Sequence, residues 1–289
     1  MDLAGVGVWT SQLRYGDQGQ AAESAAELEE LGFTALWIPD VSGGVLDSVE
    51  HLLKSTRQVV IATGILNLWM NDPADVAARF AALPEADRER TLLGIGVSHA
   101  PLIDSKEPGK YRRPLAATRA YLDAIDATPQ PVPVANRVLA ALGPKMLELA
   151  ATRSRGAHPY LVTPDHTRFA REQLGTGPLL LPEQTVLLTT DRDEARGIGT
   201  DWLKSYLALP NYRNNLLRTG FSEDDVDSVS DRLFDAIIAW GDEDTVLRRV
   251  REHLDAGADH VCVQVLTADP REFPHEQWRR LADALTRRT

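Results

Sequence analysis

The sequence predicts an α/β fold, a (β/α)8 TIM barrel in which residues 1–289 form a single domain. Eight short apolar runs recur along the chain, helical patterns lie between them, and a glycine often separates a helix from the next run. Near-continuous apolar runs are typical of parallel strands covered on both faces, and such strands require crossover helices. Eight units of this kind in 289 residues favour a closed barrel over an open sheet.

The eight expected strands share a short length and a mostly apolar composition. They are Gly5–Trp9, Ala35–Pro39, Val59–Leu66, Thr91–Gly96, Val138–Leu142, Ala157–Val162, Gln184–Leu188 and His260–Val265.

The helix, glycine and strand pattern is clearest at three places. Apolar residues at helical spacing precede Gly32, which is expected to end that helix in a left-handed conformation. The same pattern returns around Gly156 and Gly257. The fourth crossover helix is expected to include Leu115–Ile125.

The longest interval between expected strands, roughly Asp191–Trp240, is expected to be a helical insertion before the last β/α unit. Ser222 and Asp225 within it resemble a capping box. These helices could cover the barrel mouth or contact a second subunit, and a simple surface decoration is an equal alternative. The interval also carries several aromatic residues, namely Trp202, Tyr206, Tyr212 and Phe221.

Composition narrows the function classes. A net charge of −11 argues against binding to nucleic acid or to an anionic membrane surface. No apolar run reaches about 18 residues, so we expect no membrane-spanning helix. Cys262 is the only cysteine and lies in an apolar run, which predicts a buried thiol and no disulfide framework. Because the first residues lack a leader pattern, we expect a cytoplasmic protein.

Asp40 and His99 are the candidate catalytic residues. Each follows an expected strand, so in a barrel both side chains would lie at the mouth formed by the carboxyl ends of the strands. A carboxylate can orient a base or accept a hydrogen bond, and an imidazole can move a proton near neutral pH. Without the barrel, a helix cap or a surface residue is the better explanation for each of them.

Gly143-Pro144-Lys145 ends a strand and opens a helix. Free backbone N–H groups and the helix dipole attract anions there, which makes this turn a candidate phosphate site. An ordinary βα turn is the alternative. His166 lies in the first turn after Thr163-Pro164, where it could contact the same anion.

Other reaction classes receive less support. The seven histidines and single cysteine show no metal-ligand spacing, so no metal site is predicted. A serine hydrolase would need a G-x-S-x-G elbow, which is absent from the sequence. Gly94-Ile95-Gly96 lacks the third glycine of a dinucleotide fingerprint. Glu183 and Asp40 leave open a hydrolase with paired carboxylates.

Several runs taken together resemble the bacterial luciferase-like flavin and deazaflavin oxidoreductases, the group that includes coenzyme F420-dependent enzymes. The matching runs, in chain order, are ALWIPD, ATGILN, LLGIGVSH, LAALGPKMLELAA, GAHPYLVTPDH and AIIAWGDEDTVLRRVREHLDAGADHVCVQVL.

This resemblance implies a barrel that holds its cofactor at the strand ends. Asp40 matches the family's acidic residue beside the deazaflavin ring, and Gly64-Ile65 matches the position where the family often has a non-proline cis peptide behind the ring. His99 and Asp40 are the implied catalytic residues. The implied cofactor-binding residues are Asp40, Gly64, Ile65, Asn67, Ala141, Leu142, Gly143, Pro144, Lys145, Met146, Thr163 and His166.

The resemblance also implies an F420-dependent oxidoreductase that acts on a small organic molecule, and a homodimer, which is common among relatives. His99 stands where some relatives have a catalytic carboxylic acid. Val41 stands where many deazaflavin dehydrogenases have histidine, so the sugar-phosphate dehydrogenase mechanism is not supported. The alternatives are an FMN-dependent monooxygenase on the same barrel, a non-catalytic F420-binding protein and an unrelated barrel hydrolase.

Overall fold

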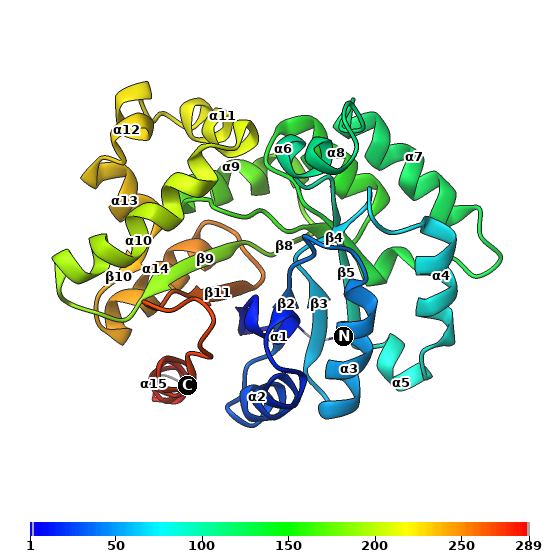
Figure 1. Ribbon diagram of the computed structural model, residues 1–289, viewed down its shortest axis with the longest axis horizontal. Coiled ribbons are helices and arrows are strands. Elements are labelled where there is room, and N and C mark those ends of the chain that lie inside the picture. The colour runs from blue at the N-terminus through cyan, green and yellow to red at the C-terminus, as the bar shows by residue number, and fades with distance from the viewer. Residues whose placement is uncertain (2, 288–289) are drawn as a thin grey trace.

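The computed structural model, which describes residue 1 and residues 3–287, has a curled parallel sheet with helices packed around it (Figure 1). Every strand pair in the sheet is parallel. The strands are β1 (Val6–Trp9), β2 (Ala35–Ile38), β3 (Val60–Thr63), β4 (Leu66–Asn67), β5 (Thr91–Gly96), β6 (Arg137–Leu139), β7 (Gly156–Ala157), β8 (Leu179–Leu180), β9 (Glu183–Leu187), β10 (Ala239–Trp240) and β11 (Val261–Val265).

The order of neighbouring strands is β10-β9-β11-β1-β2-β3-β5-β6-β7-β8, with β4 beside β5. Only Leu181 and Pro182 separate β8 from β9. On one side of this segment, Leu181 N–H donates to the Ala157 carbonyl at 2.9 Å; on the other side, Cys262 N–H donates to the Pro182 carbonyl at 3.1 Å. The segment therefore connects β7 to β11, and the sheet curls back toward its beginning.

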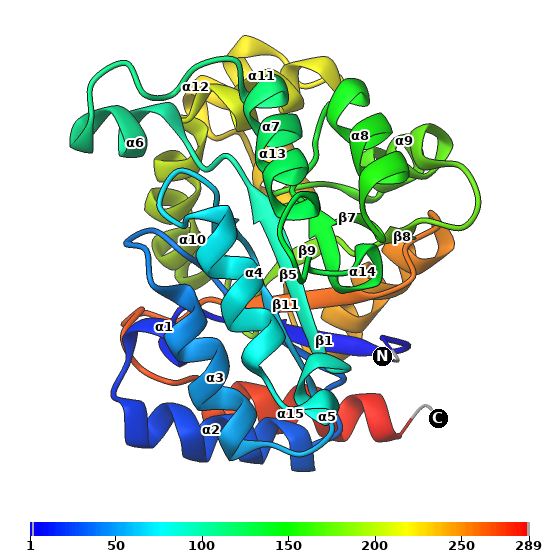
Figure 2. The ribbon, with the colours of Figure 1, turned by 90° about the vertical axis from the view of Figure 1, so that its right-hand side faces the viewer.

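The helices pack mainly against the outer face of the sheet, where their apolar sides form one large core with it (Figure 2). They are α1 (Gln12–Tyr15), α2 (Gln18–Glu30), α3 (Val45–Ser55), α4 (Pro73–Ala82), α5 (Glu85–Arg88), α6 (Ala100–Lys106), α7 (Pro114–Asp126), α8 (Pro144–Arg153), α9 (Pro164–Leu174), α10 (Arg192–Leu207), α11 (Pro210–Arg218), α12 (Glu223–Ser228), α13 (Asp231–Ile237), α14 (Glu243–Asp255) and α15 (His275–Thr286), with one 3-10 turn at Val134–Asn136.

Several expected strands differ from the observed ones. The strand expected at 91–96 is found with those bounds, whereas the one expected at 59–66 is two short strands on either side of Gly64-Ile65. The strand expected at 157–162 keeps only β7, because Pro159 has no N–H to donate and Leu161 has a φ of 57°. Two strands of two residues, β8 and β10, were not predicted because such short runs carry no periodicity.

Helices α10 to α13 follow one another between β9 and β10 and share a second apolar core. Leu203, Leu216 and Phe234 from three of these helices are buried in it. Ser222 and Asp225 form the predicted capping box at the start of α12. In Figure 1 these helices stand at the upper left, beside the sheet.

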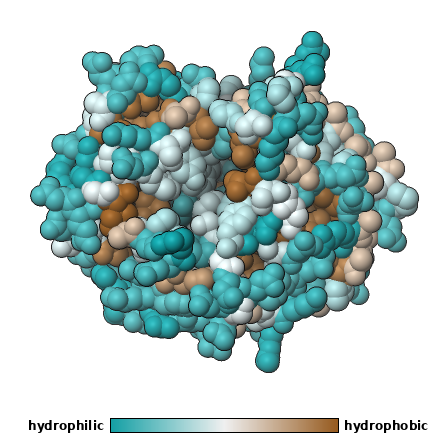
Figure 3. Space-filling view, viewed as in Figure 1, coloured by the Kyte–Doolittle hydropathy of each residue, from teal (hydrophilic) through white to brown (hydrophobic). Residues whose placement is uncertain are grey.

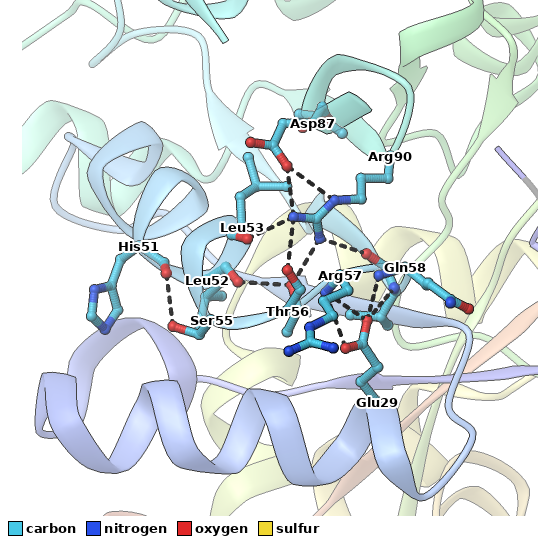
Figure 4. Close-up of polar contacts among 12 residues, drawn as sticks. Glu29, His51, Leu52, Leu53, Ser55, Thr56, Arg57, Gln58, Asp87 and Arg90 are labelled. Atoms are coloured by element: carbon cyan, nitrogen blue, oxygen red, sulfur yellow. Dashed lines mark hydrogen bonds and ion pairs between the residues drawn. The ribbon is translucent and has the colours of Figure 1, made fainter. Parts of the chain in front are cut away.

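At the amino ends of β3 and β5, two charged side chains tie the surrounding loops together (Figure 4). The buried Arg90 guanidinium donates to the Leu53 carbonyl at 2.6 Å and the Thr56 hydroxyl at 2.8 Å, and pairs with Asp87 at 2.6 Å. Glu29 accepts three consecutive backbone N–H groups, from residues 57 to 59. Burial acts to raise the pKa of Glu29, but these N–H donors hold it below its usual value.

Replacing Arg90 with alanine should lower the free energy of unfolding by about 2 kcal/mol, because several buried acceptors lose a charged donor at once. Urea unfolding followed by circular dichroism measures the change. Arg57→Ala is the matched control, since the exposed Arg57 contributes only its backbone N–H to the contacts in this region. An equal loss in both variants would contradict the assignment.

Candidate functional site

A cavity of 1080 Å³ opens at the carboxyl ends of the strands. Its lining comes from the loops after β1, β2, β5 and β11, from the segment after β6, and from helices α10 and α11. Figure 3 shows this face of the molecule hollowed near its centre, between the α10 and α11 side and the α6 to α8 side. Cavities of this size hold cofactors and drug-sized ligands in other proteins.

Asp40 lies at the edge of the cavity directly after β2 and is only 2% exposed. Its carboxylate accepts hydrogen bonds from Gly43 N–H at 2.7 Å, Asn71 Nδ2 at 2.7 Å and Asn67 N–H at 3.3 Å. The bond from Gly43 closes the β2–α3 loop on itself, and the other two connect that loop to Asn67 at the end of β4 and to Asn71 after it. Asp40 therefore fixes the shape of this part of the cavity, with its oxygens already occupied by protein donors.

Gly64 and Ile65 form the part of the cavity wall next to Asp40, and the peptide bond between them is cis, as the resemblance implied. The Gly64 carbonyl accepts Trp9 Nε1 at 2.9 Å. A Cβ at Gly64 would lie 2.6 Å from Trp9 Nε1 and 3.0 Å from His158 Nε2. Only glycine fits at this contact.

His99 also lines the cavity, at the N-cap of α6 after β5, and is half-buried. Nδ1 is 3.1 Å from Asn211 Oδ1, and since an amide oxygen only accepts, the imidazole must donate from Nδ1. Nε2 then keeps its lone pair. Desolvation lowers the pKa of His99 below its usual value, although the bond to Asn211 acts in the other direction.

The segment after β6 supplies Ala141, Leu142 and Met146 to the lining, and the N-terminus of α8 lies among them. Gly143 is the N-cap and offers no side chain to the first N–H groups of the helix. Arg218, from the end of α11, donates to the Leu142 carbonyl at 2.9 Å and also bonds to Asn215. A cation from a distant helix therefore stands beside the free end of α8.

The remaining residues implied by the resemblance lie outside the lining. Lys145 is exposed on the first turn of α8, next to Pro144. The Thr163 hydroxyl caps α9 by accepting His166 N–H, and His166 Nε2 donates to the Leu142 carbonyl at 2.9 Å. Burial lowers the pKa of His166 to about 4, so its ring is neutral and supports the α8 turn from behind.

Asn67 is fully buried and outside the lining. Its N–H donates to the Asp40 carboxylate, and its carbonyl accepts Asn71 Nδ2. The structure thus brings Asp40, Gly64, Ile65 and His99 to one cavity together with Ala141, Leu142 and Met146, whereas Gly143, Pro144 and Lys145 lie outside the lining. Asn67, Thr163 and His166 lie behind it.

Sequence reasoning did not assign the aromatic wall of the cavity. Tyr206 and Tyr212, from α10 and α11, meet Tyr160, which follows β7, with ring centroids 5.4 to 5.9 Å apart. Trp202 packs beside Tyr206, with ring centroids 4.8 Å apart and ring planes tilted by 48°. The concentration of aromatic residues in 191–240 was the one feature of the sequence that could have indicated this wall. Arg218 carried no signal, because nothing local to it indicates a ligand.

Asp40 is the one carboxylate among the described lining residues. Glu183 is fully buried, outside the lining, where it accepts the Thr185 hydroxyl at 2.6 Å. Burial raises the pKa of Glu183 to about 7. The arrangement offers no second acid for a hydrolase with paired carboxylates at this cavity.

Within residues 1 and 3–287, no group of three or more histidine, cysteine or acidic side chains is placed to hold a metal ion. In the same part of the chain, no helix combines the length and apolar character needed to cross a membrane.

Relatives share this fold over nearly the whole chain. A curated 5,10-methylenetetrahydromethanopterin reductase from Archaeoglobus fulgidus is 24% identical, with 81% of this chain and 85% of the reductase aligned. A solved F420-dependent secondary alcohol dehydrogenase, bound to an F420–acetone adduct, superposes with a TM-score of 0.75 at 15% identity, covering 98% of both chains. The oxygenating constituent of 3,6-diketocamphane monooxygenase from Pseudomonas putida, bound to FMN, superposes with a TM-score of 0.70 at 15% identity over 96% of each chain.

The model of the luciferase-like monooxygenase family matches residues 3–260. This match spans most of the curled sheet and all the segments that line the Asp40 to His99 side of the cavity. It confirms the resemblance drawn from the sequence. The chain belongs to the luciferase-like monooxygenase family, and its relatives are oxidoreductases.

Proposed function

We propose that this protein is a coenzyme F420-dependent oxidoreductase that transfers a hydride between the deazaflavin and a small organic substrate. We also infer that the curled sheet is the family's eight-stranded barrel and that α10 to α13 are its helical insertion. One observation carries the proposal: a single large cavity borders Asp40, the Gly64-Ile65 peptide, His99 and the start of α8. The F420-dependent relatives support the same cofactor.

The residues around Gly64 suit a flat, mostly apolar ring. Gly64, Ile65 and Ala141 present backbone and small or apolar side chains to the cavity. Asp40 holds the neighbouring loop in place through its three donors. These residues would hold the ring by shape and backbone contact.

The start of α8 suits the cofactor's phosphate. Its first N–H groups have no side-chain cap, and the positive end of the helix dipole lies there. Arg218 adds a guanidinium within reach, since a Cβ on Gly143 would lie 3.5 Å from its Nη1. Lys145 adds a second positive charge at the surface. Together these groups would neutralise most of a phosphate's charge.

When bound, the deazaflavin supplies or accepts the hydride. The protein's own task is then to orient the substrate and to move the matching proton. We assign this proton transfer to His99 Nε2, because Asn211 holds Nδ1 protonated and leaves Nε2 as the acceptor. The aromatic wall would help to exclude water from the same space once the ligands are bound.

An FMN-dependent monooxygenase is the second candidate, and the FMN-bound relative favours it. Both cofactors carry a phosphate and a tricyclic ring, so the cavity fits either. They differ in F420's acidic tail. A basic groove near Lys145, Arg168 or Arg171 would favour F420. Arg168 and Arg171 are each paired with an aspartate, while Lys145 makes no ion pair within the described residues.

Fluorescence titration of the purified protein with F420 and with FMN tests the proposal. We expect tight F420 binding and much weaker FMN binding. The reverse order would replace F420 with FMN in the proposal. Binding of neither would remove the oxidoreductase function altogether.

Replacing Arg218 with alanine should weaken F420 binding roughly tenfold, because a charged hydrogen bond to phosphate is lost. The same titration, repeated at increasing salt, measures it, and the salt dependence of the Kd should decrease in the variant. Arg57→Ala removes an equal charge at the other end of the barrel and should leave the Kd unchanged. A normal Kd in the Arg218 variant would place the phosphate elsewhere.

A further inference from the structure

Tyr212 is the aromatic residue of the cavity wall that lies closest to His99. The two ring centroids are 5.2 Å apart. Tyr212 comes from α11, packs against Tyr160 and Tyr206, and is 7% exposed. Both residues line the cavity, so a phenol ring and an imidazole ring lie side by side on its wall.

The hydrogen bonds of the three tyrosines differ. Tyr160 must donate to Gln264 Oε1 at 2.6 Å, because an amide oxygen only accepts. Tyr206 therefore donates to the Tyr160 oxygen at 3.0 Å. Among residues 1 and 3–287, the Tyr212 hydroxyl has no hydrogen-bond partner, although its side chain lines the cavity. A free donor of this kind is what a ligand oxygen requires.

The polar groups facing the cavity are neutral or already engaged. No lysine or arginine occurs among the described lining residues, and the Asp40 carboxylate accepts three protein donors. Burial raises the pKa of Tyr212 well above its usual value, and nearby Tyr206 and Glu183 add to this, so the hydroxyl stays protonated. A charged substrate would lose its hydration here and find no counter-ion.

We infer that the substrate is an uncharged, mostly apolar alcohol or ketone, and that the Tyr212 hydroxyl donates a hydrogen bond to its oxygen beside His99. This inference rests on the proposed function. In the oxidation direction, the alcohol O–H bond breaks and its proton passes to His99 Nε2. The carbinol C–H bond breaks and its hydrogen leaves with both electrons as a hydride to the oxidised deazaflavin, while the C=O bond forms. In the reverse direction the Tyr212 hydrogen bond polarises the carbonyl.

Isothermal titration calorimetry tests the ligand preference without any turnover. The probes are cyclohexanone and cyclohexanol, with cyclohexanecarboxylate as the charged ligand of similar shape. The wild-type protein should bind the two uncharged probes at least about tenfold more tightly than the carboxylate. Equal or tighter binding of the carboxylate would overturn the substrate class.

Tyr212→Phe tests the hydroxyl itself. It should weaken binding of both uncharged probes roughly three- to tenfold, the effect of one hydrogen bond between neutral groups. Tyr121→Phe is the matched control, because the Tyr121 hydroxyl is also buried without a partner but lies in α7, outside the cavity lining. Unchanged affinity in the Tyr212 variant, or an equal loss in the control, would overturn the role.

F420 titration of the Tyr212 variant separates this inference from the proposed function. F420 should bind the variant as tightly as the wild type, because the ring and phosphate contacts proposed above do not involve the Tyr212 hydroxyl. If F420 binds normally but the uncharged probes are not preferred over the carboxylate, only the inference about the substrate is wrong. If F420 binds neither the wild type nor the Tyr212 variant, the proposed function is wrong, whatever the probe measurements show.

Discussion

Replacing His99 with alanine should lower kcat by roughly 10²- to 10³-fold while the F420 Kd changes less than about twofold. Asn211 fixes the His99 proton on Nδ1 and leaves Nε2 as a free acceptor. His158 Nε2 also lacks a partner on the cavity wall, but His158 is only 1% exposed, whereas His99 is half-buried. Alanine removes the proton acceptor and leaves the Gly64 side of the cavity untouched. Stopped-flow kinetics of F420 absorbance, with a separate binding titration, measures the two effects.

The pH dependence of the wild-type rate should follow the same residue. Desolvation lowers the pKa of His99, so the neutral, proton-accepting form persists below the usual value of 6.5. Alcohol oxidation needs that neutral form. Its rate should therefore stay constant as the pH falls to 6.5 and decline only below it, and this decline should be absent in the alanine variant.

His51→Ala is the matched control, because the His51 ring hydrogen-bonds to the Gln18 carbonyl and neither residue belongs to the cavity lining. Its kcat and pH profile should equal those of the wild type. If His99→Ala retains full turnover, the proton passes through another group and the assignment of His99 is wrong.

Replacing Gly94 with alanine should lower the free energy of unfolding by about 3 kcal/mol, the upper part of the usual range for overpacking. A Cβ on Gly94 would lie 2.1 Å from the Thr63 carbonyl oxygen. The same carbonyl belongs to β3, next to the Gly64-Ile65 peptide, and cannot rotate away as a side chain would. The neighbouring strands must separate, so F420 binding should weaken as well.

Gly197→Ala is the control for this substitution. Gly197 lies within α10, and a Cβ there would meet no atom within 4 Å. Alanine should leave the free energy of unfolding unchanged or raise it by up to about 1 kcal/mol, because it favours the helix. Urea unfolding of both variants gives the comparison. A Gly94 variant as stable as the wild type would show that the strand contact is looser than described.

Local sequence patterns were sufficient for the parallel α/β architecture. Apolar runs and helical spacing depend on neighbouring residues, so α7 and β5 were found close to their expected bounds. Strand ends were less predictable. At β7, Pro159 and the positive φ of Leu161 end the ladder early, which an apolar pattern does not reveal.

The sequence by itself determined that Asp40 and His99 follow strands and that Gly64 precedes Ile65 in an apolar segment, because these are local properties of the chain. Only the tertiary structure decided that Arg218 stands at the start of α8 and that Tyr212 faces the cavity beside His99. Their positions depend on how α11 packs across the strand ends. That packing is the sum of many long-range contacts, and no short stretch of sequence encodes it.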